Sequence, residues 1–82
     1  MTRTLPDALR AAIARRAAEA SERDVKLAAE LDGVSLPPAR RTVVDARAGN
    51  PGESWTVVAE SAGLTVNAAV SLWRRALKRR PA

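Results

Sequence analysis

The sequence predicts an all-α protein of four helices, and three observations carry this prediction. Alanine, the strongest helix former, supplies 18 of the 82 residues. The valine pairs at 43–44 and 57–58 fall within helical spacing, so no strand is indicated. Glycine-containing breaks at 33–38, 49–52 and 63–65 divide the chain into four helical patterns. We therefore expect a long N-terminal helix followed by three shorter ones.

The first helix is expected to begin at Pro6, because the fixed backbone angle of proline suits the first turn. No Pro or Gly interrupts residues 7–32, and Gly33 is a natural stop. Ser21, with Asp24 three positions later, resembles a capping box. The sequence thus leaves one helix or a hairpin of two helices open. We favour one helix, because no residue near this point forces a turn.

The second helix is expected over residues 39–48, after a connector whose paired prolines cannot lie inside a helix. The third should extend from its N-cap Ser54 to about residue 62, and Gly63 then tolerates the positive φ common at helix C-termini. Thr65 is the expected N-cap of the last helix, which covers residues 66–79.

The last helix is predicted to have two different faces. Its apolar residues recur at spacings of four, three and four, which places them on one stripe. Polar and cationic residues occupy the opposite side at the same spacing. The apolar stripe consists of Val66, Val70, Trp73 and Leu77, and the opposite face of Asn67, Ser71, Arg74 and Lys78, with Arg75 beside them.

Composition excludes most catalytic chemistry. The chain has no Cys and no His, so it lacks a thiolate nucleophile, an imidazole base and the usual zinc ligands. We therefore expect no enzyme activity, no cofactor and no metal. No stretch approaches the roughly 20 apolar residues that span a bilayer, and no signal-peptide pattern opens the chain. We expect a cytoplasmic protein that does not enter a membrane.

The net charge of +5 lies entirely near the C-terminus. Residues 1–64 hold nine basic and nine acidic groups, whereas the remaining tail holds five basic groups and no acid. A local field of this kind attracts a polyanion such as nucleic acid. The alternative is a solvated helix end, where cations are favoured by the carbonyl dipole.

The last two predicted helices carry a family resemblance. Residues 36–79 resemble the fourth region of bacterial sigma factors, a helix-turn-helix shared in outline with response-regulator effector domains. Leu-Pro-Pro-Ala-Arg-Arg-Thr-Val-Val at 36–44 is similar to its opening helix. The segment 54–63 is similar to its scaffold helix and turn, and 64–79 to its recognition helix, with Arg-Ala-Leu-Lys-Arg at 75–79.

The resemblance implies a DNA-binding domain at residues 36–82, preceded by an N-terminal helical segment at 1–35. The recognition helix would enter the major groove, where amides and guanidinium groups distinguish bases and cations hold phosphates. Base-facing positions would include Asn67, Ser71 and Arg74. The full set of expected DNA-binding residues is Thr65, Asn67, Ala68, Ser71, Arg74, Arg75, Lys78 and Arg79, with Arg40 and Arg41 near the backbone.

Three departures from the family pattern affect this interpretation. The link at residues 49–53 is longer and more broken than the family's usual link. Leu72 stands where a basic or polar DNA-facing residue is common, so an apolar patch would replace one contact there. The promoter-melting region is absent, and residues 1–35 are too few to contain it. The resemblance therefore implies a stand-alone regulator rather than an initiation factor.

The N-terminal segment has a shallow, alanine-rich stripe. It can pair with a second copy, which we favour because two half-sites raise affinity, or fold back across the other helices. We expect a sequence-specific double-stranded DNA-binding protein that regulates transcription as a homodimer. The alternative is a protein-interaction module that binds RNA polymerase or another regulator, with weak or no DNA binding. A basic amphipathic helix on an anionic membrane ranks last, because it leaves the turn and the scaffold helix unexplained.

Overall fold

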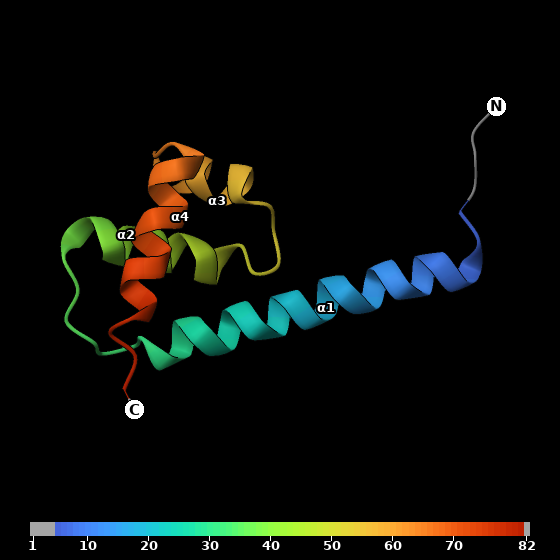
Figure 1. Ribbon diagram of the computed structural model, residues 1–82, viewed down its shortest axis with the longest axis horizontal. Coiled ribbons are helices and arrows are strands. Elements are labelled where there is room, and N and C mark those ends of the chain that lie inside the picture. Colours follow the sequence, from blue (N-terminus) through green and yellow to red (C-terminus); the bar gives the residue numbers. More distant parts are fainter. Residues whose placement is uncertain (1–4, 82) are drawn as a thin grey trace.

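The computed structural model describes residues 5–81 and contains four helices and no strand within that range. They are α1 (Asp7–Glu30), α2 (Pro38–Gly49), α3 (Trp55–Ala62) and α4 (Val66–Leu77). The prediction of a long first helix followed by three shorter ones is confirmed (Figure 1). Residues 1–4 of the expected N-terminal segment, and residue 82 of the expected DNA-binding domain, lie outside the described residues.

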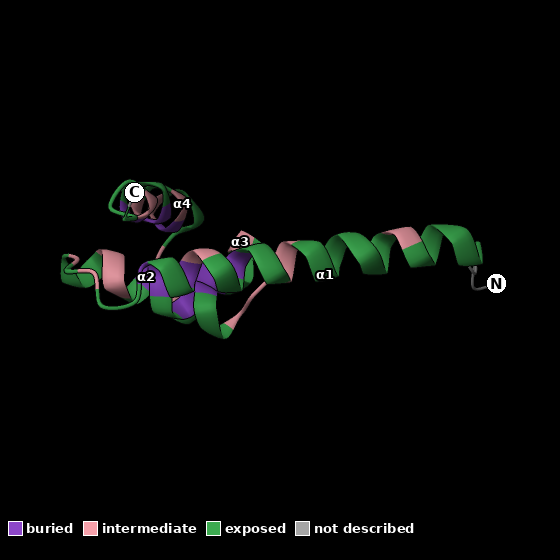
Figure 2. Ribbon diagram, turned by 90° about the horizontal axis from the view of Figure 1, so that it is seen from below, coloured by how far each residue is buried: buried purple, intermediate pink, exposed green. Residues whose placement is uncertain are grey.

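The three short helices form the body of the molecule, in which α2, α3 and α4 each pack against the other two. Helix α1 packs chiefly on α2, and only through its C-terminal part. Its N-terminal part extends beyond the body, as Figures 1 and 2 show. The result is an elongated molecule of 50 × 28 × 16 Å.

Helix α1 is continuous over 24 residues, so the two-helix alternative is wrong. The expected capping box does not form: Ser21 and Asp24 lie within the helix. Asp24 points instead into the contact between α1 and the body, where it is 4% exposed. The favoured prediction of one helix is therefore confirmed. A serine followed three residues later by an acid matches the capping pattern whether or not a helix starts there.

The predicted caps of α3 and α4 are confirmed. The Ser54 hydroxyl accepts a hydrogen bond from the Val57 amide at 3.4 Å, and the Thr65 hydroxyl accepts one from the Ala68 amide at 3.2 Å. Gly63 adopts φ +70° between the two helices. Each cap satisfies an amide that the first helical turn leaves without a backbone partner.

The core is small and is built from side chains of all four helices, together with Leu31 just after α1. Leu31, Val43, Val44 and Val58 are its largest fully buried side chains. From α4, Trp73 enters the core at 6% exposure and meets the half-buried Trp55 edge to face, with ring centroids 6.2 Å apart. Edge-to-face aromatic pairs of this kind add stabilisation beyond their buried area.

The buried stripe of α4 is rotated from the predicted one. Its buried residues are Ala69, Trp73 and Ala76, whereas Val66 is 41% exposed. Small alanines let α4 approach its neighbours closely, so the helix turns its alanine side inward. Leu72 packs against this core as a half-buried residue and does not line the groove on α4, so it does not form the apolar patch expected among the DNA contacts.

A buried ion pair ties α1 to the body. Arg47 Nη2 of α2 lies 2.7 Å from Asp24 Oδ2, and both side chains are under one-tenth exposed. The same carboxylate oxygen accepts the Gly52 amide at 2.8 Å, while Arg47 Nη1 donates to the Glu53 carbonyl at 2.6 Å. The Arg47 guanidinium also stacks 4.7 Å from the ring centre of Trp55. One acid on α1 thus fixes both α2 and the loop after it.

Candidate nucleic-acid interface

The exposed face of α4 gathers the polar and cationic residues that the sequence placed there. They lie on the side of the helix opposite Ala69, Trp73 and Ala76. Together with Val70 they line a shallow surface groove. The groove-lining residues are Asn67, Val70, Ser71, Arg74, Arg75 and Lys78.

The body holds this face outward through contacts on the other side of α4. Trp73 anchors the middle of the helix against Trp55 of α3, and Leu64 packs against the core just before the helix begins. Because the buried side chains are fixed by packing, the polar ones on the opposite face have a defined direction. Asn67, Ser71 and Arg74 are all exposed.

The charged residues on this face of α4 are all positive. The last acidic residue of the chain is Glu60, so α4 carries no carboxylate. Among residues 5–81, no carboxylate lies within ion-pair distance of Arg74, Arg75, Lys78 or Arg79. Arg80 differs, because its Nη1 atom lies 3.4 Å from Glu30 Oε2 on α1. Four cations of the C-terminal cluster therefore remain free to meet an anion.

Two of the residues predicted to contact DNA at the start of α4 have little capacity left for hydrogen bonding. Thr65 is exposed, but its hydroxyl already accepts the Ala68 amide as the helix cap. Ala68 is half-buried and has only a methyl group to offer. The first turn of α4 thus presents Asn67 as its main hydrogen-bonding side chain.

Arg41, which was expected near the DNA backbone, has a structural position instead. Its Nη2 atom donates to the carbonyls of Leu31 at 3.0 Å and Val34 at 2.6 Å, and its Nη1 atom lies 4.0 Å from Asp45. The guanidinium thereby ties α2 to the connector that follows α1. Arg40 is half-buried on α2 and does not line the groove on α4. These two arginines are therefore not part of the surface described here.

Sequence reasoning assigned Val70 to the core face, but it lines the groove among polar residues. Asp24 was considered only as part of a capping box and Arg47 was given no role, although they are the buried polar residues of the described chain. No sequence signal identifies that pair, since the two residues are 23 positions apart and meet only because α1 crosses the body.

Comparison with known proteins finds no match: no family model, no curated protein and no solved structure corresponds to this chain. The resemblance to sigma-factor region four consequently stays a prediction from the residues. Within residues 5–81, no helix combines the length and apolar character needed to cross a bilayer.

Proposed function

We propose that the protein binds double-stranded DNA with sequence specificity and regulates transcription. Helix α4 lies in the major groove, and α3 with the Gly63 turn supports it as a helix-turn-helix. Asn67, Ser71 and Arg74 contact base edges. Arg75, Lys78 and Arg79 contact phosphates.

One observation carries this proposal: the exposed face of α4 combines an amide, a hydroxyl and free cations with no acid nearby. Amide and guanidinium groups can each make two hydrogen bonds to a base edge, and phosphate contacts fix a protein on the duplex. A helix end that served only solubility would not need the amide and hydroxyl aligned with the cations.

The regulator acts as a homodimer on two half-sites. A single α4 of 12 residues reaches only a few base pairs, so a second copy is needed for an operator of useful length. Two-fold symmetry of the protein would then be mirrored in the operator.

The test is binding to the DNA upstream of the protein's own gene, located by footprinting and followed by fluorescence anisotropy over a range of salt. About three phosphate contacts per copy predict a log–log slope of about −2.5 to −3 for each bound copy. The triple variant Arg74→Ala, Arg75→Ala, Lys78→Ala should lose binding and most of this slope. A matched control, Arg15→Ala, Arg23→Ala, Lys26→Ala, removes the same charge from exposed positions of α1 and should bind nearly as wild type.

A salt slope near zero, or equal losses for the two triple variants, would contradict the proposal. The first result would favour the alternative function, a module that binds RNA polymerase or another regulator. That alternative predicts protein capture through a surface other than the α4 groove.

A further inference from the structure

The described chain leaves several large apolar side chains in solvent, and they are not scattered. Six are exposed, of which Leu5, Leu9 and Ile13 lie at the N-terminal end of the chain and Val25 lies further along α1. Leu9 and Ile13 continue the stripe through which Leu27 and Leu31 pack against the body. We call residues 5–20 the arm. The arm extends beyond the body, and most of its residues are exposed (Figure 2).

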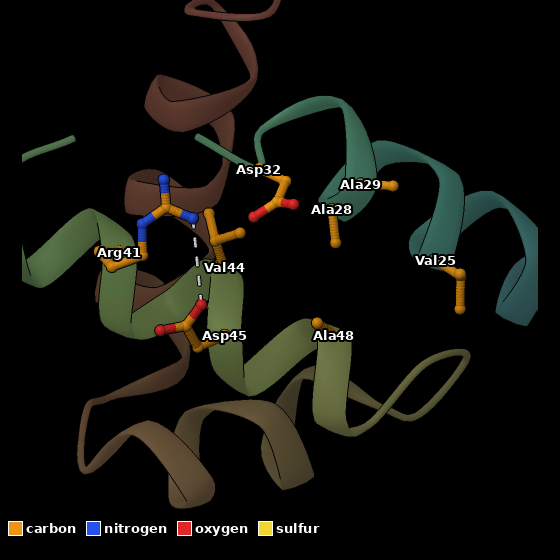
Figure 3. A pocket seen from close by; sticks show the side chains of 8 residues that line it. All are labelled: Val25, Ala28, Ala29, Asp32, Arg41, Val44, Asp45 and Ala48. Carbon is orange, nitrogen blue, oxygen red and sulfur yellow. Dashed lines mark ion pairs between the residues drawn. The ribbon is translucent and has the colours of Figure 1, made fainter. Parts of the chain in front are cut away.

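A second unfilled apolar feature lies between α1 and α2. It is a cleft of about 250 Å³ with an apolar lining (Figure 3). Small-molecule pockets usually begin near about 300 Å³, so this cleft suits one or two aliphatic side chains better than a ligand. Its apolar lining consists of Val25, Ala28, Ala29, Val44 and Ala48.

The two features have opposite charges at their edges. On the arm, helical spacing places Arg10 on one side of the stripe and Arg16 on the other. At the cleft, Asp32 and Asp45 are exposed carboxylates. The third charged residue there, Arg41, is held by two backbone carbonyls and also lies 4.0 Å from Asp45. Among the described residues that line the cleft, Asp32 is thus the carboxylate without an ion-pair partner. The stripe on the arm is thus apolar with basic residues at its edges, and the cleft is apolar with a net negative charge at its edge. The two surfaces are therefore complementary.

The arm cannot reach the cleft of its own chain. Ile13 and Ala28 are 15 positions apart on the same continuous helix, which separates them by roughly 22 Å along a rigid axis. The arm of one molecule can reach only the cleft of another. We propose that two copies of this chain dock reciprocally, the arm of each lying in the α1–α2 cleft of the other.

Reciprocal docking uses each surface once per copy and closes after two copies, as a two-fold dimer requires. It leaves the exposed face of α4 uncovered in both copies. The dimer supplies the partner on which the proposed function rests, but it can be measured without DNA. Failure of the dimer and failure of DNA binding are thus distinguishable.

The first experiment is sedimentation of the full chain, without DNA, over a range of concentrations. Ile13→Glu on the arm and Val25→Glu in the cleft should each weaken the dimer at least about tenfold, because each places an unpaired charge in an apolar contact. Ala11→Glu, an exposed position on the opposite side of the arm, is the matched control and should change the dimer less than about twofold. Circular dichroism should show equal helix content in all four proteins, since both target side chains are half-exposed in the monomer.

A second experiment tests directly whether the arm of one copy contacts the cleft of another. The chain has no cysteine, so Ile13→Cys and Val25→Cys each introduce a single thiol. Under mild oxidation by air, a mixture of the two variants should cross-link into covalent dimers faster than either variant alone. A wild-type chain that stays monomeric to millimolar concentration would overturn the proposal. So would a Val25→Glu protein that dimerises normally, cross-linking that is fastest for Ile13→Cys alone, or a mass that grows past two copies.

Discussion

At the residue scale, the Asp24–Arg47 pair is the most sensitive point of the fold. Both side chains are nearly excluded from solvent, and Arg47 Nε has no hydrogen-bond partner within the described structure. A buried pair of this kind contributes little compared with an apolar replacement, because desolvation offsets the attraction. Removal of one partner is different, since it leaves the other charge buried and unpaired.

We expect Asp24→Ala to lower the free energy of unfolding by about 3–5 kcal/mol, as measured by urea denaturation. The double variant Asp24→Leu, Arg47→Met should recover most of this loss, because neither charge is then buried alone. A double variant as unstable as Asp24→Ala would show that the pair itself, and not the orphaned charge, stabilises the protein.

Gly52 and Gly33 form a natural comparison. Both adopt positive φ, +75° and +74°, which strains any other residue. A Cβ atom at Gly52 would also lie 3.1 Å from the Ser21 Cβ atom and 3.2 Å from the Ala17 carbonyl, whereas a Cβ atom at Gly33 would meet nothing within 4 Å. Gly33→Ala should cost about 1 kcal/mol. Gly52→Ala should cost clearly more, and equal denaturation midpoints for the two variants would contradict this contact.

On the proposed DNA-facing side of α4, Arg74 and Lys78 should have different roles in binding. Arg74→Ala is expected to cost about 1–3 kcal/mol on the operator and to relax specificity, because a base contact is lost. Lys78→Ala should weaken operator and scrambled duplexes alike, because a phosphate contact carries no sequence information. Anisotropy titrations on both duplexes check this. Equal losses of both variants on both duplexes would refute the assigned roles.

At the element scale, helix ends were predictable and helix faces were less so. Ser54, Gly63 and Thr65 act locally, within one turn of the backbone, so their residue types were enough to place both ends of α3 and the start of α4. The end of α4 lies at Leu77, two residues before the predicted one. The inward side of α4 depends on how closely its neighbours approach. For that reason the sequence pattern gave the wrong position to Val66 and Leu72.

The candidate site was predictable to a similar degree. The residues that line the α4 groove follow from helical spacing, apart from Val70. The position of Arg41 was not predictable in this way, because its guanidinium donates to the carbonyls of Leu31 and Val34 in the segment after α1. The residues around Arg41 in the sequence do not indicate these partners. Pairing over a long sequence distance is decided by the packing of whole helices.

The Thr65 cap gives a prediction for α4 as a unit. Thr65→Ala removes the acceptor for the Ala68 amide and should lower the free energy of unfolding by about 0.5–2 kcal/mol. Thr65→Ser keeps the hydroxyl and should be close to wild type. Thermal denaturation of the three proteins is the measurement, and an unchanged Thr65→Ala protein would mean that solvent replaces the cap without cost.

At the scale of the whole molecule, the tie between α1 and the body matters most for the proposed operator. If dimerisation occurs through α1, the distance between the two α4 helices is fixed by the angle at which α1 leaves the body. We expect binding to duplexes with two half-sites to show one sharp optimum of spacing. A gel-shift series in which the spacing changes one base pair at a time tests this, and equal affinity across the series would contradict a rigid connection.

Gly52 lies close to Ser21 and to the Ala17 carbonyl. The loop after α2 therefore influences the angle at which α1 leaves the body. The part of α1 before this contact is roughly 20 Å long. A change of about ten degrees in the tilt of α1 would therefore move its N-terminal end by roughly 4 Å, which is about one base-pair step. Under the proposed function, substitutions in this loop would therefore change which operators are recognised, while the proposed base-contacting residues stay the same.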